Sequence, residues 1–156
     1  MAGAAGGVGT FVVQLAKARG ASVVATASPD HHAYLRDLGA DEVLDYHDDW
    51  VPAATGVDAA FDAVGGDTLR QAVQAVRAGG RAVTIASGDV ERHGDVRVSS
   101  FQVSNSRARL AEVAALIDAG QVRVEISARL PLDEAAHAHE LVEAGHTRGK
   151  ILLLPG

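Results

Sequence analysis

Seven residues near the amino terminus carry the clearest chemical signal. Residues 3–9 read Gly-Ala-Ala-Gly-Gly-Val-Gly and run directly into a stretch with apolar residues at helical spacing. Small side chains let a ligand approach the backbone, and the N–H groups at a helix start bind anions such as phosphate. This combination is typical of a loop that binds the pyrophosphate of a dinucleotide. The expected contacts are Ala5, Gly6, Gly7 and Val8.

The strand expected at residues 22–27 ends without the acidic residue that an NAD site uses. About twenty residues beyond such a glycine loop, an Asp or Glu normally accepts hydrogen bonds from the ribose 2′-hydroxyl of NAD. Here the chain reads Thr26, Ala27 and Ser28. Because no carboxylate stands there to repel a 2′-phosphate, the sequence predicts that the cofactor is NADPH.

The remaining reactive residue types do not form a recognisable catalytic set. The chain has no Cys, which excludes a thiolate nucleophile and a Cys-based zinc or iron–sulfur site. His137 and His139 lie two residues apart on an expected helix and face different sides, whereas helical metal ligands stand three or four residues apart. The sequence also lacks a serine-hydrolase elbow, an HExxH zinc motif and a Walker loop. We therefore expect no metal and assign no catalytic residue.

The elements that must position the glycine loop alternate between strands and helices. Runs rich in Val, Ile and Leu predict strands at residues 22–27, 42–45, 58–64, 81–87, 96–103, 122–128 and 150–154. Apolar residues at helical spacing predict helices through residues 11–18, 69–76, 110–117 and 136–142. Gly20 follows the first helix, Gly79 and Gly80 follow the second, and Ser106 precedes the third as a cap. This alternation is typical of β-α-β units on a parallel sheet.

Length and composition favour one globular domain over residues 1–156. Hydrophobic residues make up 47% of the 156-residue chain and charged residues 22%, with no apolar run of 18 residues that would span a membrane. The net charge of -6, without a basic stripe, argues against nucleic acid or a membrane surface as a partner and leaves a small-molecule substrate or another protein. Because residues 1–9 lack the features of a secretion signal, cytoplasm is the expected location.

Six segments of the chain occur in the same order in one known family. They are GAAGGVG with FVVQLAKARGASVVAT, LGADEVLDY, FDAVGG, GGRAVTIAS, PLDEAAHAHELVEAG and RGKILLLP. With these segments the chain resembles the cofactor-binding domain of the medium-chain dehydrogenase/reductase superfamily, in its zinc-independent quinone oxidoreductase branch. The resemblance implies an α/β fold, a Rossmann-like three-layer doubly wound parallel sheet. It also implies hydride transfer from NADPH to a quinone or an α,β-unsaturated carbonyl.

The resemblance implies further cofactor contacts. In the family a Ser, a nearby Lys and a Tyr hold the 2′-phosphate or the adenine; Ser28 and Tyr46 match, and His31 stands at the position of the Lys. His is mostly neutral near pH 7, whereas Lys is charged. A second interpretation of His31 and His32 is that both are solvated side chains at a helix start. Two segments that resemble the parts of the family near the ribose and the nicotinamide add Val64, Gly65, Ala86 and Ser87.

Two parts of the family pattern are missing from the sequence. Family members carry an N-terminal GroES-like domain that forms most of the substrate cleft, and a central strand precedes the glycine loop. Here only Met1 and Ala2 precede that loop. In the strand order 3-2-1-4-5-6 the missing first central strand has a neighbour on each side, so two edges are left unpaired. We expect the gap to be closed by residues 150–154, by a segment of another chain, or by direct pairing of strands 22–27 and 58–64.

The missing parts keep other functions open. One alternative is a repurposed Rossmann domain without redox turnover, acting as a cyclase, an isomerase or the partner subunit of a longer enzyme. Another is an inactive fragment of a reductase, truncated relative to the family. A partner chain that supplies the missing strand or the cleft domain is compatible with each of them. Family members dimerise through an edge strand, and residues 96–103 lack the Pro and repeated Lys that blunt such an edge, so we expect a homodimer.

Overall fold

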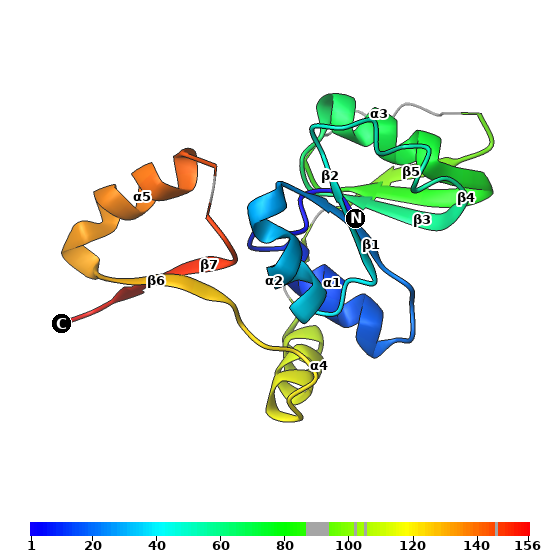
Figure 1. Cartoon of the computed structure of the whole chain (residues 1–156). Helices are drawn as coiled ribbons and strands as arrows, with labels where there is room; N and C mark the ends of the chain where they lie inside the picture. Colours follow the sequence, from blue (N-terminus) through cyan, green and yellow to red (C-terminus); the bar gives the residue numbers. More distant parts are fainter. Residues whose placement is uncertain (87–93, 102, 105, 146) are drawn as a thin grey trace.

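The computed structural model describes residues 1–86, 94–101, 103–104, 106–145 and 147–156. Helices and strands alternate along the chain (Figure 1): α1 (Gly9–Ala18), β1 (Val24–Ala27), a 3-10 helix (Pro29–His31), α2 (His32–Asp37), β2 (Glu42–Asp45), β3 (Val57–Asp62), α3 (Gly66–Ala75), β4 (Val76–Thr84), β5 (Arg97–Ser100), α4 (Arg107–Asp118), β6 (Ile126–Pro131), a second 3-10 helix (Leu132–Glu134), α5 (Ala135–Glu143) and β7 (Lys150–Leu154). In this described part every strand ladder is parallel. The predicted α/β, Rossmann-like fold is confirmed.

The strands form three groups. β1 pairs with β2, β3 pairs with β4 and β4 with β5, and β6 pairs with β7. None of the described helices is long and apolar enough to cross a membrane. The predicted strands 42–45 and 150–154 have the bounds of β2 and β7, whereas β6 begins four residues later than the predicted strand 122–128.

Met1 and Ala2 join β1, at Val24 and Thr26, to the carboxyl end of β3. Four backbone hydrogen bonds make the junction: Met1 N to Val24 O (2.7 Å), Thr26 N to Met1 O (2.9 Å), Ala2 N to Phe61 O (2.9 Å) and Ala63 N to Ala2 O (3.3 Å). Ala2 also forms an isolated parallel bridge with Asp62. These two residues therefore occupy one end of the first-strand position, between β1 and β3.

Two of the three expected ways to close the gap are wrong. Residues 150–154 form β7, whose ladder with β6 places it in a separate sheet. β1 and β3 do not pair with each other, because Met1 and Ala2 lie between them. Closure by a segment of another chain stays a prediction.

Apolar side chains cover both sides of β1. Alternate residues of this segment point to opposite faces, as in any strand. On one face Ala25 and Ala27 pack in a buried cluster with Val13 of α1 and Leu35 of α2. On the other face Val24 packs against a second cluster that contains Trp50 and the small residues Ala72 and Ala75 of α3. Figure 1 shows α1 and α2 on one side of the strands and α3 on the other, which is the expected three-layer arrangement.

Gly79 and Gly80 do not end α3, contrary to the prediction. The helix ends at Ala75, and β4 begins at the next residue, so both glycines lie inside β4. A Cβ atom added to Gly80 would stand 2.4 Å from Cγ1 of Val76 and 2.8 Å from the carbonyl oxygen of Asp58. Gly80 is therefore needed for the close approach of β4 to its neighbour β3, a role that sequence alone does not distinguish from a helix stop.

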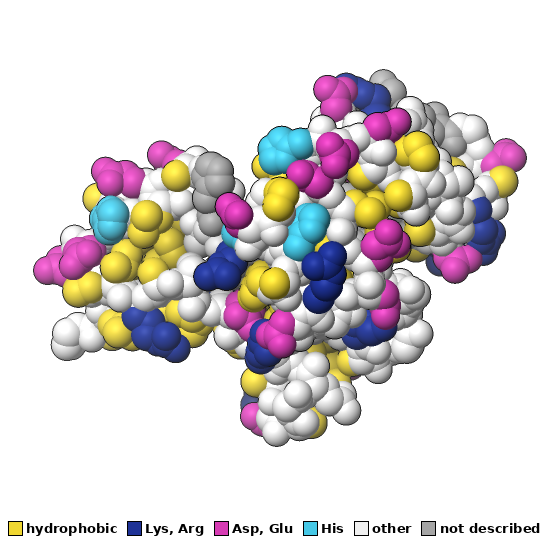
Figure 2. Space-filling model, viewed as in Figure 1, with side chains coloured by type: hydrophobic (Ala, Val, Ile, Leu, Met, Phe, Trp, Pro, Cys, Tyr) yellow, Lys and Arg dark blue, Asp and Glu magenta, His cyan; other side chains and the backbone are white. Residues whose placement is uncertain are grey.

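The unit of β6, α5 and β7 lies to one side of the strands β1 to β5 (Figure 1). Hydrogen bonds of residues that lie just before β6 and β7 attach it to α1 and the glycine loop. Gln14 exchanges two hydrogen bonds with the backbone of Arg123, at 2.8 and 3.1 Å, and Gly149 N donates to Ala5 O at 3.0 Å. Figure 2 shows hydrophobic side chains gathered over this unit, where Leu132 and Val142 are exposed. The unit thus presents an apolar face beside the glycine loop.

Candidate functional site

A cavity of about 510 Å³ lies at the carboxyl ends of β1 and β3. It brings together the glycine loop, the residues after β1, the end of β2 and the loop after β3. The lining includes these residues that the sequence predicted as cofactor contacts: Ala5, Gly6, Gly7, Val8, Ser28, His31, Tyr46 and Val64. None of the described residues that line this cavity is acidic. Ligands of open α/β sheets bind at this edge, so the position fits a nucleotide site.

Two glycines of the loop serve different purposes. A Cβ atom on Gly9 would stand 2.1 Å from Gly3 O and 2.7 Å from Ala4 Cα, so the fold of the loop requires a glycine there. A Cβ atom on Gly6 would have Gly3 O at 3.5 Å as its nearest contact, which is an ordinary distance. The chain itself therefore tolerates a side chain at Gly6. Because Gly6 lines the cavity, such a side chain would occupy ligand space instead.

The start of α1 presents backbone donors to the cavity. The helix is 10 residues long, and its N-cap residue, Val8, provides no capping side chain. Within the described chain the N–H groups of Gly7 and Val8 have no hydrogen-bond partner, whereas Gly6 N donates to Gly3 O at 3.3 Å. Unpaired N–H groups at the positive end of a helix dipole attract an anion. The geometry fits a pyrophosphate.

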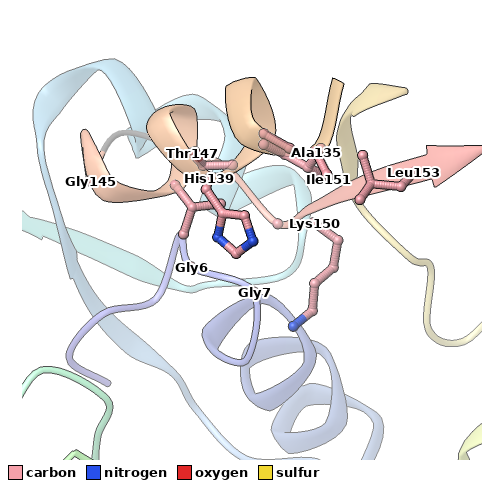
Figure 3. Close-up of a pocket in the computed structure, with 12 residues that line it drawn as sticks. Gly6, Gly7, Ala135, His139, Gly145, Thr147, Lys150, Ile151 and Leu153 are labelled. Atoms are coloured by element: carbon pink, nitrogen blue, oxygen red, sulfur yellow. The ribbon is translucent and has the colours of Figure 1, made fainter. Parts of the chain in front are cut away.

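Lys150 brings a positive charge to the glycine loop, and sequence reasoning did not identify it. Figure 3 shows its side chain extending from the start of β7 toward Gly7 and the first turn of α1. A Cβ atom on Gly7 would be 2.7 Å from the Lys150 Nζ atom, which shows how close the ammonium group is. Lys150 also lines a second cavity of about 470 Å³, together with Gly6 and His139. The only sequence signal was its place in the segment RGKILLLP.

A buried carboxylate holds the loop after β3 in place. Asp62 is fully buried, and its Oδ2 atom accepts hydrogen bonds from Thr84 Oγ1 at 2.7 Å and Gly65 N at 3.0 Å. Its Oδ1 atom accepts from Val64 N at 3.2 Å. The Thr84 hydroxyl in turn accepts from Ala86 N at 3.2 Å. Asp62 and Thr84 therefore position the loops that follow β3 and β4. The sequence placed Asp62 at the start of the segment expected near the ribose, but it assigned this positioning role to neither residue.

The other predicted residues of these two loops lie elsewhere. Gly65 turns its N–H toward Asp62 and does not line the cavity of about 510 Å³. Val64 lines this cavity, and its side chain is 55% exposed. Ala86 is exposed and is also absent from the lining, although its neighbour Ile85 contributes to it. Ser87 lies outside the described residues. The expected contacts of Gly65 and Ala86 with the ribose and the nicotinamide stay predictions.

Three polar side chains surround the end of the cavity beyond β1. Ser28 makes no capping hydrogen bond to the 3-10 helix that follows it, and His31 lies on that helix. Tyr46 is 50% exposed, and its ring centroid lies 4.1 Å from that of His47. His32 Nε2 lies 3.1 Å from Ala27 O in a partly buried position, so the interpretation of His32 as a solvated side chain is wrong.

The described residues contain no group of three or more His, Cys, Asp or Glu side chains that could hold a metal ion. His137 lies 3.5 Å from Glu140 one helical turn away, which is a contact of two exposed side chains.

Comparisons with known proteins agree with this geometry. Residues 38–153 match a family model described as zinc-binding dehydrogenase. The chloroplastic NADPH-dependent alkenal/one oxidoreductase of Arabidopsis thaliana is 34% identical over an alignment of 156 residues, which covers 97% of this chain and 39% of that protein. The chain spans about half the length of the first curated relatives it matches, at 47% and 46%.

Two solved structures are similar along nearly the whole chain. The quinone oxidoreductase from Coxiella burnetii has a TM-score of 0.89 and 34% identity, covering 97% of this chain and 50% of that one. A mycobacterial protein solved in complex with NADPH has a TM-score of 0.84 and 29% identity, covering 99% of this chain and 55% of that one.

Proposed function

Because the chain belongs to the zinc-binding dehydrogenase family, the medium-chain dehydrogenase/reductase group that its sequence resembles, we propose that it binds NADPH and takes part in hydride transfer to a quinone or an α,β-unsaturated carbonyl. The observation that carries the proposal is the cavity where the glycine loop, Ser28 and Tyr46 meet without an acidic residue. NADPH, when bound, supplies the hydride. The chain supplies binding and orientation.

The glycine loop binds the pyrophosphate in this proposal. The N–H groups of Gly7 and Val8 donate to phosphate oxygens, and the dipole of α1 favours the negative charge. Lys150, beside Gly7, neutralises part of that charge. Gly6 leaves the space that the phosphates need.

The region beyond β1 distinguishes NADPH from NADH. Ser28 and His31 donate hydrogen bonds to the 2′-phosphate, and Tyr46 packs beside the adenine. A carboxylate at this position would instead accept from a free 2′-hydroxyl and repel a phosphate. The absence of acidic residues from the described lining supports NADPH.

The identity of the electron acceptor rests on the relatives. The similar proteins are named as a quinone oxidoreductase and an NADPH-dependent alkenal/one oxidoreductase, and the compounds in both names are conjugated carbonyl compounds. Zinc, which the family description mentions, does not fit the side chains of the described region, and the proposal contains no step that uses it. We assign no catalytic residue.

Titration of the purified chain with NADPH and with NADH tests the proposal. We expect tighter binding of NADPH, by at least about tenfold, which corresponds to about 1.4 kcal/mol. Ser28→Asp should weaken NADPH binding and bring the two affinities together or reverse their order. Ser104→Asp, at an exposed residue outside the cavity, is the matched control for added charge.

Two results of that titration would overturn the proposal. Equal affinities of the wild-type chain for NADPH and NADH would remove the role of Ser28. Binding of neither dinucleotide would remove the oxidoreductase assignment and favour the repurposed, non-redox domain.

A further inference from the structure

Gln14 is a buried polar residue in the middle of α1. Its relative exposure is only 6%. The Nε2 atom donates to Thr10 O at 3.0 Å and to Arg123 O at 3.1 Å, and the Oε1 atom accepts from Arg123 N at 2.8 Å. A buried amide group is costly unless its donors and its acceptor have partners. Gln14 obtains most of these partners from the backbone of Arg123, as a strand would from its neighbour.

The bonds of Gln14 join α1 to a segment that is 109 residues away in the chain. This segment, residues 123–125, leads directly into β6. Arg123 also forms an ion pair with Asp37 of α2, but the two side chains are 51% and 67% exposed. An exposed ion pair contributes little to stability. The buried bonds of Gln14 therefore hold residues 123–125 on α1 more firmly than the ion pair does.

The position of Lys150 depends on the same segment. Lys150 N donates to Glu125 O at 2.8 Å, and Gly149 N donates to Ala5 O at 3.0 Å. A Cβ atom on Gly149 would stand 2.3 Å from Glu125 O, so the two segments touch at this point. The backbone before Lys150 is thus held from two sides. One side is the glycine loop, and the other is the segment that Gln14 binds.

The ammonium group of Lys150 lies beside the glycine loop as a result. Figure 3 shows the side chain extending toward Gly7 and the first turn of α1. Within the described residues its Nζ atom has no hydrogen-bond or ion-pair partner, and neither have the N–H groups of Gly7 and Val8. An unpaired ammonium next to unpaired backbone donors attracts an anion. Gln14 lies on the same helix that begins there, so one rigid element carries both the backbone donors and the residue that ties down the lysine.

We propose that Gln14 is a positioning residue of the phosphate site. By holding Arg123 on α1, its amide keeps the Lys150 ammonium beside Gly7. Gln14 itself is absent from the linings of both cavities at the glycine loop, so it acts through Lys150. This role rests on the proposed function, because the anion that Lys150 meets there is the pyrophosphate of the dinucleotide.

Inorganic pyrophosphate tests this role without a dinucleotide. Its binding to the 156-residue chain is followed by the NMR shifts of the Gly7 and Val8 amides. Gln14→Met keeps the length of the side chain but leaves the N–H and C=O groups of Arg123 without partners, so it should weaken binding at least about threefold. NADPH should lose affinity by a similar factor. Gln74→Met, at an exposed position of α3, is the matched control and should bind like the wild-type chain.

A double-mutant cycle separates positioning of Lys150 from a general loosening of the fold. Lys150→Met should itself weaken pyrophosphate binding, because the ammonium is lost. When Gln14→Met is added to Lys150→Met, affinity should not fall further, because the group through which Gln14 acts is already gone. A loosened fold would instead give losses that add.

A second pair of variants removes the same bond from the other partner. Arg123→Pro lacks the N–H group that donates to Gln14, whereas Arg123→Ala keeps it, and both lose the ion pairs of the side chain. The Pro variant should bind pyrophosphate at least about threefold more weakly than the Ala variant. This comparison also serves if Gln14→Met does not fold.

The possible results distinguish this role from the proposed function. Unchanged affinities in Gln14→Met, additive losses in the double variant, or equal binding by the two Arg123 variants would overturn the role of Gln14. So would the absence of any shift of the Gly7 and Val8 amides with either ligand. Pyrophosphate binding that depends on Gln14, in a chain that binds neither NADPH nor NADH, would support the role and remove only the proposed function.

Discussion

At the scale of single residues, we expect Gly6 to matter for ligand binding and Gly9 to matter for folding. Gly6→Ala adds a Cβ atom at an ordinary 3.5 Å from Gly3 O, so stability should change by less than about 1 kcal/mol. Gly9→Ala places its Cβ atom 2.1 Å from the same oxygen, so the backbone must move and stability should fall by about 2–3 kcal/mol. Urea denaturation measures both values.

The larger Gly6→Val variant tests whether the nucleotide lies against Gly6. Its side chain should enter the cavity and reduce NADPH affinity by at least about tenfold while the protein stays folded. Ala119→Val, at the exposed end of α4, controls for the added methyl groups. Unchanged affinity in Gly6→Val would remove the pyrophosphate from this loop.

The Met1 amino group makes stability depend on pH. Burial lowers its pKa from 8.0 to about 6, while the charge of Asp62 acts in the opposite direction. Between pH 8 and pH 6 the amino group of the unfolded chain therefore binds a proton that the folded chain does not. As a result, the free energy of unfolding has its full value above pH 8 and decreases as the pH falls toward 6. The loss amounts to at most about 3 kcal/mol.

Nitrogen-15 labelling of Met1 tests this pH dependence directly. The chemical shift of its amino nitrogen should titrate with a midpoint near 6, and mass spectrometry verifies that Met1 is retained. Acetylation of the amino group should remove this part of the pH dependence, which separates it from that of the seven His residues. A midpoint near 8 would show that the amino group is solvated.

At the scale of elements, the hydroxyl of Thr84 ties the end of β4 to the end of β3. Thr84→Val removes the donor to Asp62 and the acceptor for Ala86 without changing the size of the side chain much, and should cost about 1–3 kcal/mol. NADPH affinity should fall too, because the loop that carries Val64 is held by the same carboxylate. Thr55→Val, at an exposed turn, is the control. Equal stability of the two variants would contradict this positioning role.

The elements next to the glycine loop could be predicted because their signals are local. The apolar spacing of α1, the run that forms β1 and the Ser106 cap each depend on residues within one segment; Ser106 Oγ does accept from Arg109 N at 3.4 Å. Lys150 could not be found in this way, since it reaches Gly7 only through contacts between distant segments, such as the bond from Gly149 N to Ala5 O. The positioning role of Asp62 could not be predicted for a related reason, because its partner Thr84 lies on the neighbouring strand.

At the scale of the whole molecule, β5 is the outer strand of the sheet β3-β4-β5 and has no further strand beside it among the described residues. Phe101 N donates to Thr84 O at 3.2 Å, so Val98 and Ser100 direct their N–H groups away from β4. We propose that this edge pairs with a second copy, and we expect sedimentation equilibrium to give twice the 16.0 kDa chain mass. Ser100→Pro should yield monomers, because it removes an outward donor and keeps the ladder with β4. Ser100→Ala should stay dimeric, and a monomeric wild-type chain would exclude the pairing.

The contact between Gly149 and Ala5 has a consequence for the order of folding. It joins segments near opposite ends of the chain, at an N···O distance of 3.0 Å, and it brings Lys150 to the glycine loop. Closing so long a loop carries a large entropic cost, and contacts between distant segments form slowly. During synthesis α1 and β1 leave the ribosome long before β7 exists. The end of the cavity that binds phosphate in the proposed function is therefore among the last parts of the molecule to be completed, and we expect a nascent chain to bind a dinucleotide only after β7 has docked.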